Sequence, residues 1–280
     1  MQDSTLPPLT TRFTLGSEIT PSQERFLDEN GFLVFNQVIS EEEVAQMVSE
    51  FTRIGEEWAE QGRHTINGVP LFRGKDHQGN LFIQRLAFTS LHSAYIHSIL
   101  HDERFEPIRK LIGDKARVGD EEKDGAVVSR YLNCKGSVYP KLGWHTDGLR
   151  DVFYLRRPKR MLNVGLHFDA CDLDDGGLRL IPGTHNQGFW DTVFRKANFI
   201  SHDEDPNEVA VLTKPGDLTI HDGRLWHRVQ ESKFTDERSL RRVMYVPYLT
   251  DEYQPKNAES PTPLYHHLSR AMCWYKRNFK

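Results

Sequence analysis

Apolar residues in the first part of the chain recur at the spacing of one helical face, which predicts helices there. Residues 20–23 (Thr-Pro-Ser-Gln) fit a capping box, and Gly31 is a stop signal, so we expect a helix over about 21–30. Residues 32–39 form an apolar run of β-type composition. Residues 40–43 form a second capping box, which begins a longer helix with Val44, Met47, Val48, Phe51, Ile54 and Trp58 on one face. A further helix is expected near 103–112.

From about residue 126 the pattern changes to short runs with strand-like alternation, separated by Gly, Pro, Asn and Asp. The candidate strands are 126–134, 161–169, 177–182, 209–213, 217–222 and 241–249. Several short strands between turn signals favour a β-sandwich or barrel. We therefore expect a mainly β fold with flanking helices, formed by a single domain over 20–280 that follows an extended arm over 1–19.

Composition excludes several classes of protein. The 280 residues include 40 acidic and 36 basic side chains, for a net charge of −4, which argues against nucleic-acid binding. No apolar run approaches the length of a membrane span, and the amino terminus lacks the basic start and apolar run of a secretory signal. The three cysteines, at 134, 171 and 273, form neither a CxxC pair nor an even disulfide framework. These features predict a cytoplasmic protein.

The 13 histidines point towards chemistry, because imidazole is the commonest metal ligand. A mononuclear non-haem iron site needs two imidazoles and one carboxylate on one face of the metal. A histidine and an acid two residues apart on a strand can supply two of these ligands, since such residues project to the same side. The chain contains four such pairs: His101/Glu103, His145/Asp147, His167/Asp169 and His202/Glu204.

Local context favours the pair at 145 and 147, which lies in a turn between β-like segments with glycine on both sides. The pair at 101 and 103 falls at a helix start, where such residues point apart. The pair at 202 and 204 lies in an acidic loop, and Asp169 begins an acidic turn. A third ligand should come from a later strand, and segment 214–227 offers His221 and His227 as alternatives.

Five elements of the chain, taken in order, resemble the phytanoyl-CoA dioxygenase-like family of Fe(II)/2-oxoglutarate-dependent oxygenases. They are the helix–strand–helix entry at 23–44, the His-Thr-Asp motif at 145–147, the turn and strand at 174–185, the segment 215–227 and the closing strand 241–248. The resemblance covers most of the chain. It implies a double-stranded β-helix, a cupin-like jelly roll, with helices packed outside.

By position, the resemblance implies that His145, Asp147 and His227 bind Fe(II), with 2-oxoglutarate and O₂ as cosubstrates. It also implies that an arginine of the closing strand binds a carboxylate of 2-oxoglutarate, which suits the bidentate fork of a guanidinium. The strand pattern selects Arg241, whereas the family's usual spacing from the distal histidine selects Arg238.

Three further residues fall near positions that line the family's cosubstrate pocket: Tyr131, Asn133 and Asn163. Family members often carry a tryptophan on the later of these strands. Here residues 163–165 are Asn-Val-Gly, so this wall of the pocket departs from the family pattern.

The substrate is expected to be a small molecule. Segment 150–160 carries five basic residues just after two of the expected ligands, so Arg156 and Arg157 are candidates to bind an anionic substrate, the alternative being a solvated loop. Hydroxylation of an unactivated C–H bond is the expected reaction, although desaturation or ring formation would use the same residues. A non-catalytic jelly roll that binds a metal or small ligand, as a sensor or carrier, is the alternative function.

Overall fold

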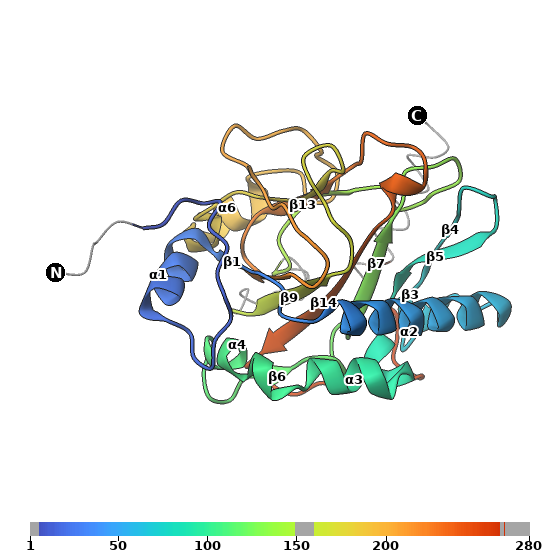
Figure 1. The fold of residues 1–280 in the computed structure, drawn as a ribbon, viewed down its shortest axis with the longest axis horizontal. Helices are drawn as coiled ribbons and strands as arrows, with labels where there is room; N and C mark the ends of the chain where they lie inside the picture. Colours follow the sequence, from blue (N-terminus) through green and yellow to red (C-terminus); the bar gives the residue numbers. More distant parts are fainter. Residues whose placement is uncertain (1–5, 149–159, 264–265, 267–280) are drawn as a thin grey trace.

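The computed structural model describes residues 6–148, 160–263 and 266, and two antiparallel sheets form its centre (Figure 1). The larger sheet has the order β1 (Phe32–Phe35), β12 (Leu218–Asp222), β9 (Leu162–His167), β14 (Arg241–Leu249), β7 (Val127–Tyr131), β5 (Leu81–Leu86) and β4 (Phe72–Lys75), with β6 (Arg117–Val118) paired to β14. The smaller sheet has the order β11 (Val209–Ala210), β10 (Gly177–Leu180), β13 (His227–Gln230) and β8 (Leu142–His145). A separate hairpin joins β2 (Thr65–Ile66) and β3 (Val69–Pro70).

The helices flank these sheets, and α2 and α3 run side by side beneath the larger one in Figure 1. The α-helices are α1 (Pro21–Asn30), α2 (Glu41–Glu60), α3 (Ala94–Leu100), α4 (Glu106–Lys110) and α6 (Phe189–Phe194). Short 3₁₀ turns are η1 (Thr89–His92), η2 (Glu103–Phe105), η3 (Thr184–Asn186) and η4 (Glu237–Ser239).

Both predicted capping boxes are present. The Thr20 hydroxyl accepts a hydrogen bond from the Gln23 amide, while the Gln23 side chain accepts one from the Thr20 amide. Gly31 ends α1 with a φ of 82°, in the left-handed region that favours glycine. Ser40 begins α2 with the same reciprocal arrangement. These local signals explain why the bounds of α1 agree with those predicted.

The main core lies between α2 and the larger sheet. Met47, Phe51 and Ile54 are at most 1% exposed, and the Phe51 ring packs 5.1 Å from that of Phe168, just after β9. Between the two sheets, Val229 of β13 packs in a second cluster with Val243 of β14. The sheets therefore face each other, which confirms the predicted mainly β, double-stranded β-helix architecture.

Most predicted strands are present, but several strands outside the predicted ranges were missed, among them β4, β5 and β8. β8 reads Leu-Gly-Trp-His and β4 reads Phe-Arg-Gly-Lys, so glycine and polar residues interrupt the apolar alternation that a sequence pattern needs. In β4 the glycine has a structural reason: a Cβ on Gly74 would lie 2.2 Å from the Gln84 side-chain oxygen. The predicted helix near 103–112 forms as η2 followed by α4.

The described part of the amino-terminal segment lies along β1. The Phe13 amide donates to the Val34 carbonyl, and Arg12 forms an ion pair with the buried Asp217. Cys134 and Cys171 are free thiols, and the third cysteine lies outside the described residues. None of the described helices combines the length and apolar character that crossing a bilayer requires.

Candidate functional site

Pairing of two strands in the smaller sheet brings two predicted ligands together. His145 ends β8, His227 begins β13, and the two residues are direct partners in the antiparallel register, with ring centroids 4.0 Å apart. Asp147 follows β8 by two residues, and its Oδ1 lies 3.9 Å from Nε2 of each histidine. One donor atom from each of the three residues lies within 4.8 Å of the others, a spacing that can hold a metal ion.

Backbone carbonyls orient both imidazoles. Nδ1 of His145 donates to the Gly143 carbonyl at 2.8 Å, and Nδ1 of His227 donates to the Leu225 carbonyl at 2.9 Å. Because Nδ1 carries the proton in each ring, the lone pair of each neutral imidazole is on Nε2, directed at Asp147. The two rings are thus held in the tautomer that binds a metal through Nε2.

The larger sheet holds the carboxylate from the opposite side. Asn163 of β9 and His221 of β12 are register partners in this sheet. Asn163 donates its side-chain N–H to Asp147 Oδ2 at 3.1 Å, and His221 Nε2 lies 3.5 Å from the same oxygen. These contacts leave Oδ1 directed at the two histidines. Asn163, predicted to contact the cosubstrate, therefore positions the predicted carboxylate ligand in this structure.

The electrostatics of the group favour its metal-binding protonation states. Burial lowers the pKa of His145 and of His227, which keeps both rings neutral at neutral pH. Burial alone would raise the pKa of Asp147, but His227, His221 and His145 outweigh it and hold that pKa below its usual range. Neutral imidazoles and an ionised carboxylate are the forms that bind a divalent cation without first releasing protons.

A backbone segment covers the outer edge of β8. Trp144 exchanges hydrogen bonds with Phe199 and Ser201, and the Phe199 ring stacks on the His145 ring at 4.7 Å. Gly143 makes this approach feasible, since a Cβ there would lie 2.7 Å from the Phe199 backbone. No motif or spacing pointed to Phe199, which is 54 positions beyond the histidine it covers.

Arg241, the first residue of β14, places a buried cation beside the metal-ligand group. Its guanidinium donates to the Gln230 carbonyl at 2.8 Å and the Pro140 carbonyl at 3.1 Å, while its buried Nε has no hydrogen-bond partner. No described carboxylate lies within ion-pair distance of it. Burial lowers the pKa of Arg241, because the positive charge has left water without a counter-ion. Because a buried charge is costly unless it is paired, this guanidinium is suited to bind an anionic ligand.

A small cavity adjoins Arg241, and its lining includes Tyr131, His167 and Tyr245. Tyr245 of β14 packs over β9 where a Cβ on Gly165 would lie 2.3 Å from its ring. Its ring also meets that of His221 edge-on at 5.8 Å. The Tyr245 ring thus lies against the stretch 163–165, where this chain lacks the tryptophan that family members often carry. The absence of a side chain at Gly165 leaves room for the ring.

The remaining predicted residues take different positions. Arg238 is on the surface, where it pairs with Asp236 at 2.8 Å and has a side chain 67% exposed. Arg242 points away from Arg241 and pairs with Asp169. Asn133 lies beyond the end of β7 and donates its side-chain N–H to the Ser232 carbonyl at 2.9 Å. Its contact with a cosubstrate stays a prediction. Arg156 and Arg157 lie outside the described residues.

The three histidine–acid pairs set aside from sequence do not form metal groups among the described residues. Asp169 pairs with Arg242, while His167 contacts Thr219 at 3.0 Å. The histidine at 101 belongs to a separate cluster with His97 and Asp120. These partners are 4 and 19 positions away in the sequence, so a histidine–acid spacing of two does not predict the cluster.

The pH dependence of stability tests whether the His167 imidazole is buried and neutral in the folded protein. Burial is the main cause that lowers its pKa to about 4. An unfolded chain protonates histidine near pH 6.5, so the native state loses stability as the pH falls from about 6.5 towards 4. We expect this residue alone to lower the free energy of unfolding by about 2 kcal/mol between pH 7 and pH 5. Urea denaturation at both pH values should show that the free energy of unfolding falls less for His167→Gln than for the wild type. An equal fall in the two proteins would contradict a buried neutral imidazole at position 167.

Comparisons with solved structures agree with this fold. EvdO2 from Micromonospora carbonacea var. aurantiaca, solved with 2-oxoglutarate, is 18% identical with a TM-score of 0.55, over 89% of this chain and 97% of that one. The epimerase SnoN, solved with Fe³⁺, α-ketoglutarate and nogalamycin RO, is 15% identical with a TM-score of 0.58, over 86% of this chain and 93% of SnoN. EvdMO1 is 16% identical with a TM-score of 0.58, over 82% of this chain, which spans only 50% of EvdMO1.

A search of curated proteins gave no match. The sequence profile of the phytanoyl-CoA dioxygenase (PhyH) family matches residues 27–235, which is most of the chain and includes both histidines and the aspartate of the candidate metal group. Arg241 lies just beyond the matched segment. The extent of this match shows that the chain belongs to the phytanoyl-CoA dioxygenase family.

Proposed function

We propose that the protein is an Fe(II)- and 2-oxoglutarate-dependent oxygenase that hydroxylates a C–H bond of a small molecule. One observation carries the proposal: two neutral imidazoles and a carboxylate converge between two sheets, and an arginine without an acidic partner is buried beside them. Membership of the phytanoyl-CoA dioxygenase family supports it. EvdO2 and SnoN were solved with 2-oxoglutarate, and SnoN also with iron.

The donor set fits Fe(II). Two histidines and one carboxylate on one face of a metal are typical of non-haem iron oxygenases, because they leave positions open for a chelating cosubstrate and O₂. His145, Asp147 and His227 would be the ligands. Asn163 and the Gly143 and Leu225 carbonyls would hold them in place, as outer contacts of metal ligands commonly do.

The surroundings of Arg241 fit the far carboxylate of 2-oxoglutarate. His227 begins β13, and the Gln230 carbonyl that accepts from Arg241 ends it, so the two features are roughly 10 Å apart along that strand. A five-carbon dicarboxylate that chelates the metal through its keto-acid end can extend its other carboxylate over this gap. The unpartnered Nε of Arg241 would then gain an acceptor.

Bound iron would supply the oxidising chemistry, using O₂ and 2-oxoglutarate and giving succinate and CO₂. The chain's own residues orient the reactants and exclude water. Phe199 shields one face of the His145 ring, and Tyr245 closes the wall over Gly165. The substrate C–H bond would have to approach the metal from a direction that neither residue covers.

The class of substrate is a separate part of the proposal. Arg156 and Arg157, the candidates to bind an anionic substrate, lie in a segment outside the described residues. The neighbouring Arg160 already pairs with Asp28 at 3.3 Å and lies 3.8 Å from Asp222. An anionic small molecule stays the predicted substrate, and hydroxylation the predicted outcome.

Release of succinate tests the proposed activity. Protein loaded anaerobically with Fe(II) should develop a visible charge-transfer band on addition of 2-oxoglutarate. On admission of O₂ it should convert 2-oxoglutarate to succinate, slowly without substrate and faster with a matching member of a metabolite library. Metal binding without the band, and without succinate under any condition, would instead favour the alternative function of a non-catalytic metal or ligand binder.

A further inference from the structure

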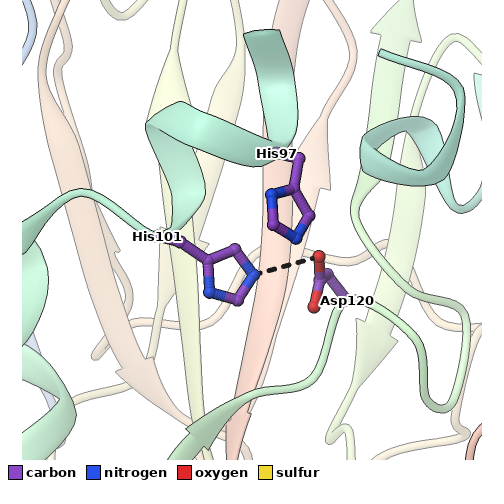
Figure 2. Close-up of side chains that lie close together, drawn as sticks. All are labelled: His97, His101 and Asp120. Atoms are coloured by element: carbon purple, nitrogen blue, oxygen red, sulfur yellow. Dashed lines mark hydrogen bonds and ion pairs between the residues drawn. The ribbon is translucent and has the colours of Figure 1, made fainter. Parts of the chain in front are cut away.

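A second group of potential metal ligands lies at the far end of β14 from Arg241. His97 of α3 and His101, which caps the carboxyl end of that helix, lie close to Asp120, which follows β6 (Figure 2). One donor atom from each residue lies within 4.8 Å of the others. Val118 of β6 pairs with Tyr248 near the end of β14, so this group is roughly 23 Å along the strand from Arg241. It is therefore separate from the proposed iron site.

Helical spacing places the two histidines on one face. Residues four apart on a helix are neighbours, and the rings of His97 and His101 stack at a centroid distance of 4.3 Å. The opposite face of α3 buries Ile96, Ile99 and Leu100 in the main core. This packing fixes the helix so that both imidazoles are held at the surface, and they lie at its carboxyl end, where the helix dipole favours a cation.

The carboxylate of Asp120 is buried without an adequate counter-charge. Its side chain is 5% exposed, and its one hydrogen-bond or ion-pair partner among the described side chains is His101, at 3.3 Å. The side chain of His101 is itself 40% exposed. The nearby arginines are engaged elsewhere: Arg117 with Glu122, and Arg109 with Glu106. A buried carboxylate with so little compensation favours a bound cation.

The backbone that presents Asp120 is as well fixed as the helix. The Gly119 amide donates to the Pro247 carbonyl at 2.8 Å, and a Cβ on Gly119 would lie 2.9 Å from that oxygen. The Glu122 amide then donates to the Gly119 carbonyl at 3.1 Å, which closes a tight turn around Asp120. Two rigid elements that are distant in sequence therefore direct three ligand atoms at one point.

We propose that His97, His101 and Asp120 bind a zinc ion. Imidazole nitrogen with carboxylate oxygen is a ligand set that suits zinc, whereas calcium and magnesium favour oxygen ligands alone. Three protein ligands leave the fourth tetrahedral position for water at the exposed side. The ion would tie α3 to the turn after β6 and neutralise Asp120.

Zinc stoichiometry tests the proposal. After equilibrium dialysis of the metal-free protein against zinc chloride, elemental analysis should give two zinc ions per chain in the wild type, because zinc also fits the His-Asp-His group of the iron site. His97→Ala, His101→Ala and Asp120→Asn should each bind one. His77→Ala, which removes an exposed histidine from the turn between β4 and β5, is the matched control and should still bind two.

A second measurement separates the two sites. In the double variant His145→Ala/His227→Ala, zinc should still bind at one ion per chain and raise the thermal midpoint, and adding His97→Ala should remove both effects. His97 is exposed, so this change should not disturb folding, which circular dichroism can check. Two zinc ions in His97→Ala, or none in the His145→Ala/His227→Ala protein while it remains folded, would overturn the proposal without affecting the proposed oxygenase activity.

Discussion

Replacement of His227 by alanine is expected to abolish Fe(II) binding and, with it, the conversion of 2-oxoglutarate to succinate. Mutation of a residue that only supports a metal ligand typically lowers metal affinity or activity by about 10–100-fold. Removal of a ligand itself should therefore lower Fe(II) affinity and succinate formation by more than about 100-fold. Asp147→Ala should have an equally large effect, because no other described carboxylate lies within reach of both imidazoles. Titration of the metal-free proteins with Fe(II), followed by the succinate assay, measures both quantities.

His221→Ala is the informative comparison for this prediction. His221 was the alternative third ligand, it is buried, and its ring lies 4.4 Å from that of His227. Its nearest Asp147 oxygen is, however, Oδ2 rather than the Oδ1 that faces the other two histidines. We expect its loss to weaken metal binding far less. The reverse order, with His221→Ala inactive and His227→Ala active, would show that the ligand assignment is wrong.

Replacement of Arg241 by glutamine is expected to raise the KM for 2-oxoglutarate on the order of 100-fold. Removal of one partner from a buried, hydrogen-bonded charge pair destabilises a complex by roughly 2–5 kcal/mol, and every 1.4 kcal/mol is tenfold. Fe(II) affinity should change little, since Arg241 touches none of the proposed ligands. Initial rates of succinate formation against 2-oxoglutarate concentration give the KM.

Arg238→Gln is the matched control, because it removes the same charge from the arginine that the family's usual spacing selects. Arg238 is exposed and already paired with Asp236, so its variant should keep the wild-type KM. Arg241→Lys should recover only part of the affinity, since an ammonium lacks the planar fork that binds a carboxylate through two hydrogen bonds. A raised KM in Arg238→Gln alone would contradict the assignment of Arg241.

Local signals made the entry helices predictable. A capping box specifies the start of a helix within four residues, and Gly31 ends α1 by itself, so neither depends on the rest of the fold. The strands that carry His145 and His227 were harder to predict. β8 and β13 have four residues each and contain a glycine or polar side chains, so they become strands through pairing with each other and not through their own patterns.

Contacts between elements that are distant in sequence limited the prediction of the site. Motif order pointed to His145, Asp147, His227 and Arg241, and the structure brings the first three together. The roles of Asn163, His221 and Phe199 depend on how the two sheets face each other, which no spacing along the chain records. The cluster of His97, His101 and Asp120 was missed for the same reason, because a helix and a turn meet there.

The backbone pairing of Trp144 with Phe199 and Ser201 bears on how long a bound metal would remain. β8 is an edge strand, and edge strands open more readily than strands paired on both sides. Here the 199–201 segment occupies that free edge and lies over His145. While this segment stays in place, the edge strand that carries His145 is held closed, so local opening of the segment, and not the strength of the metal–ligand bonds alone, would contribute to the rate at which a bound metal dissociates.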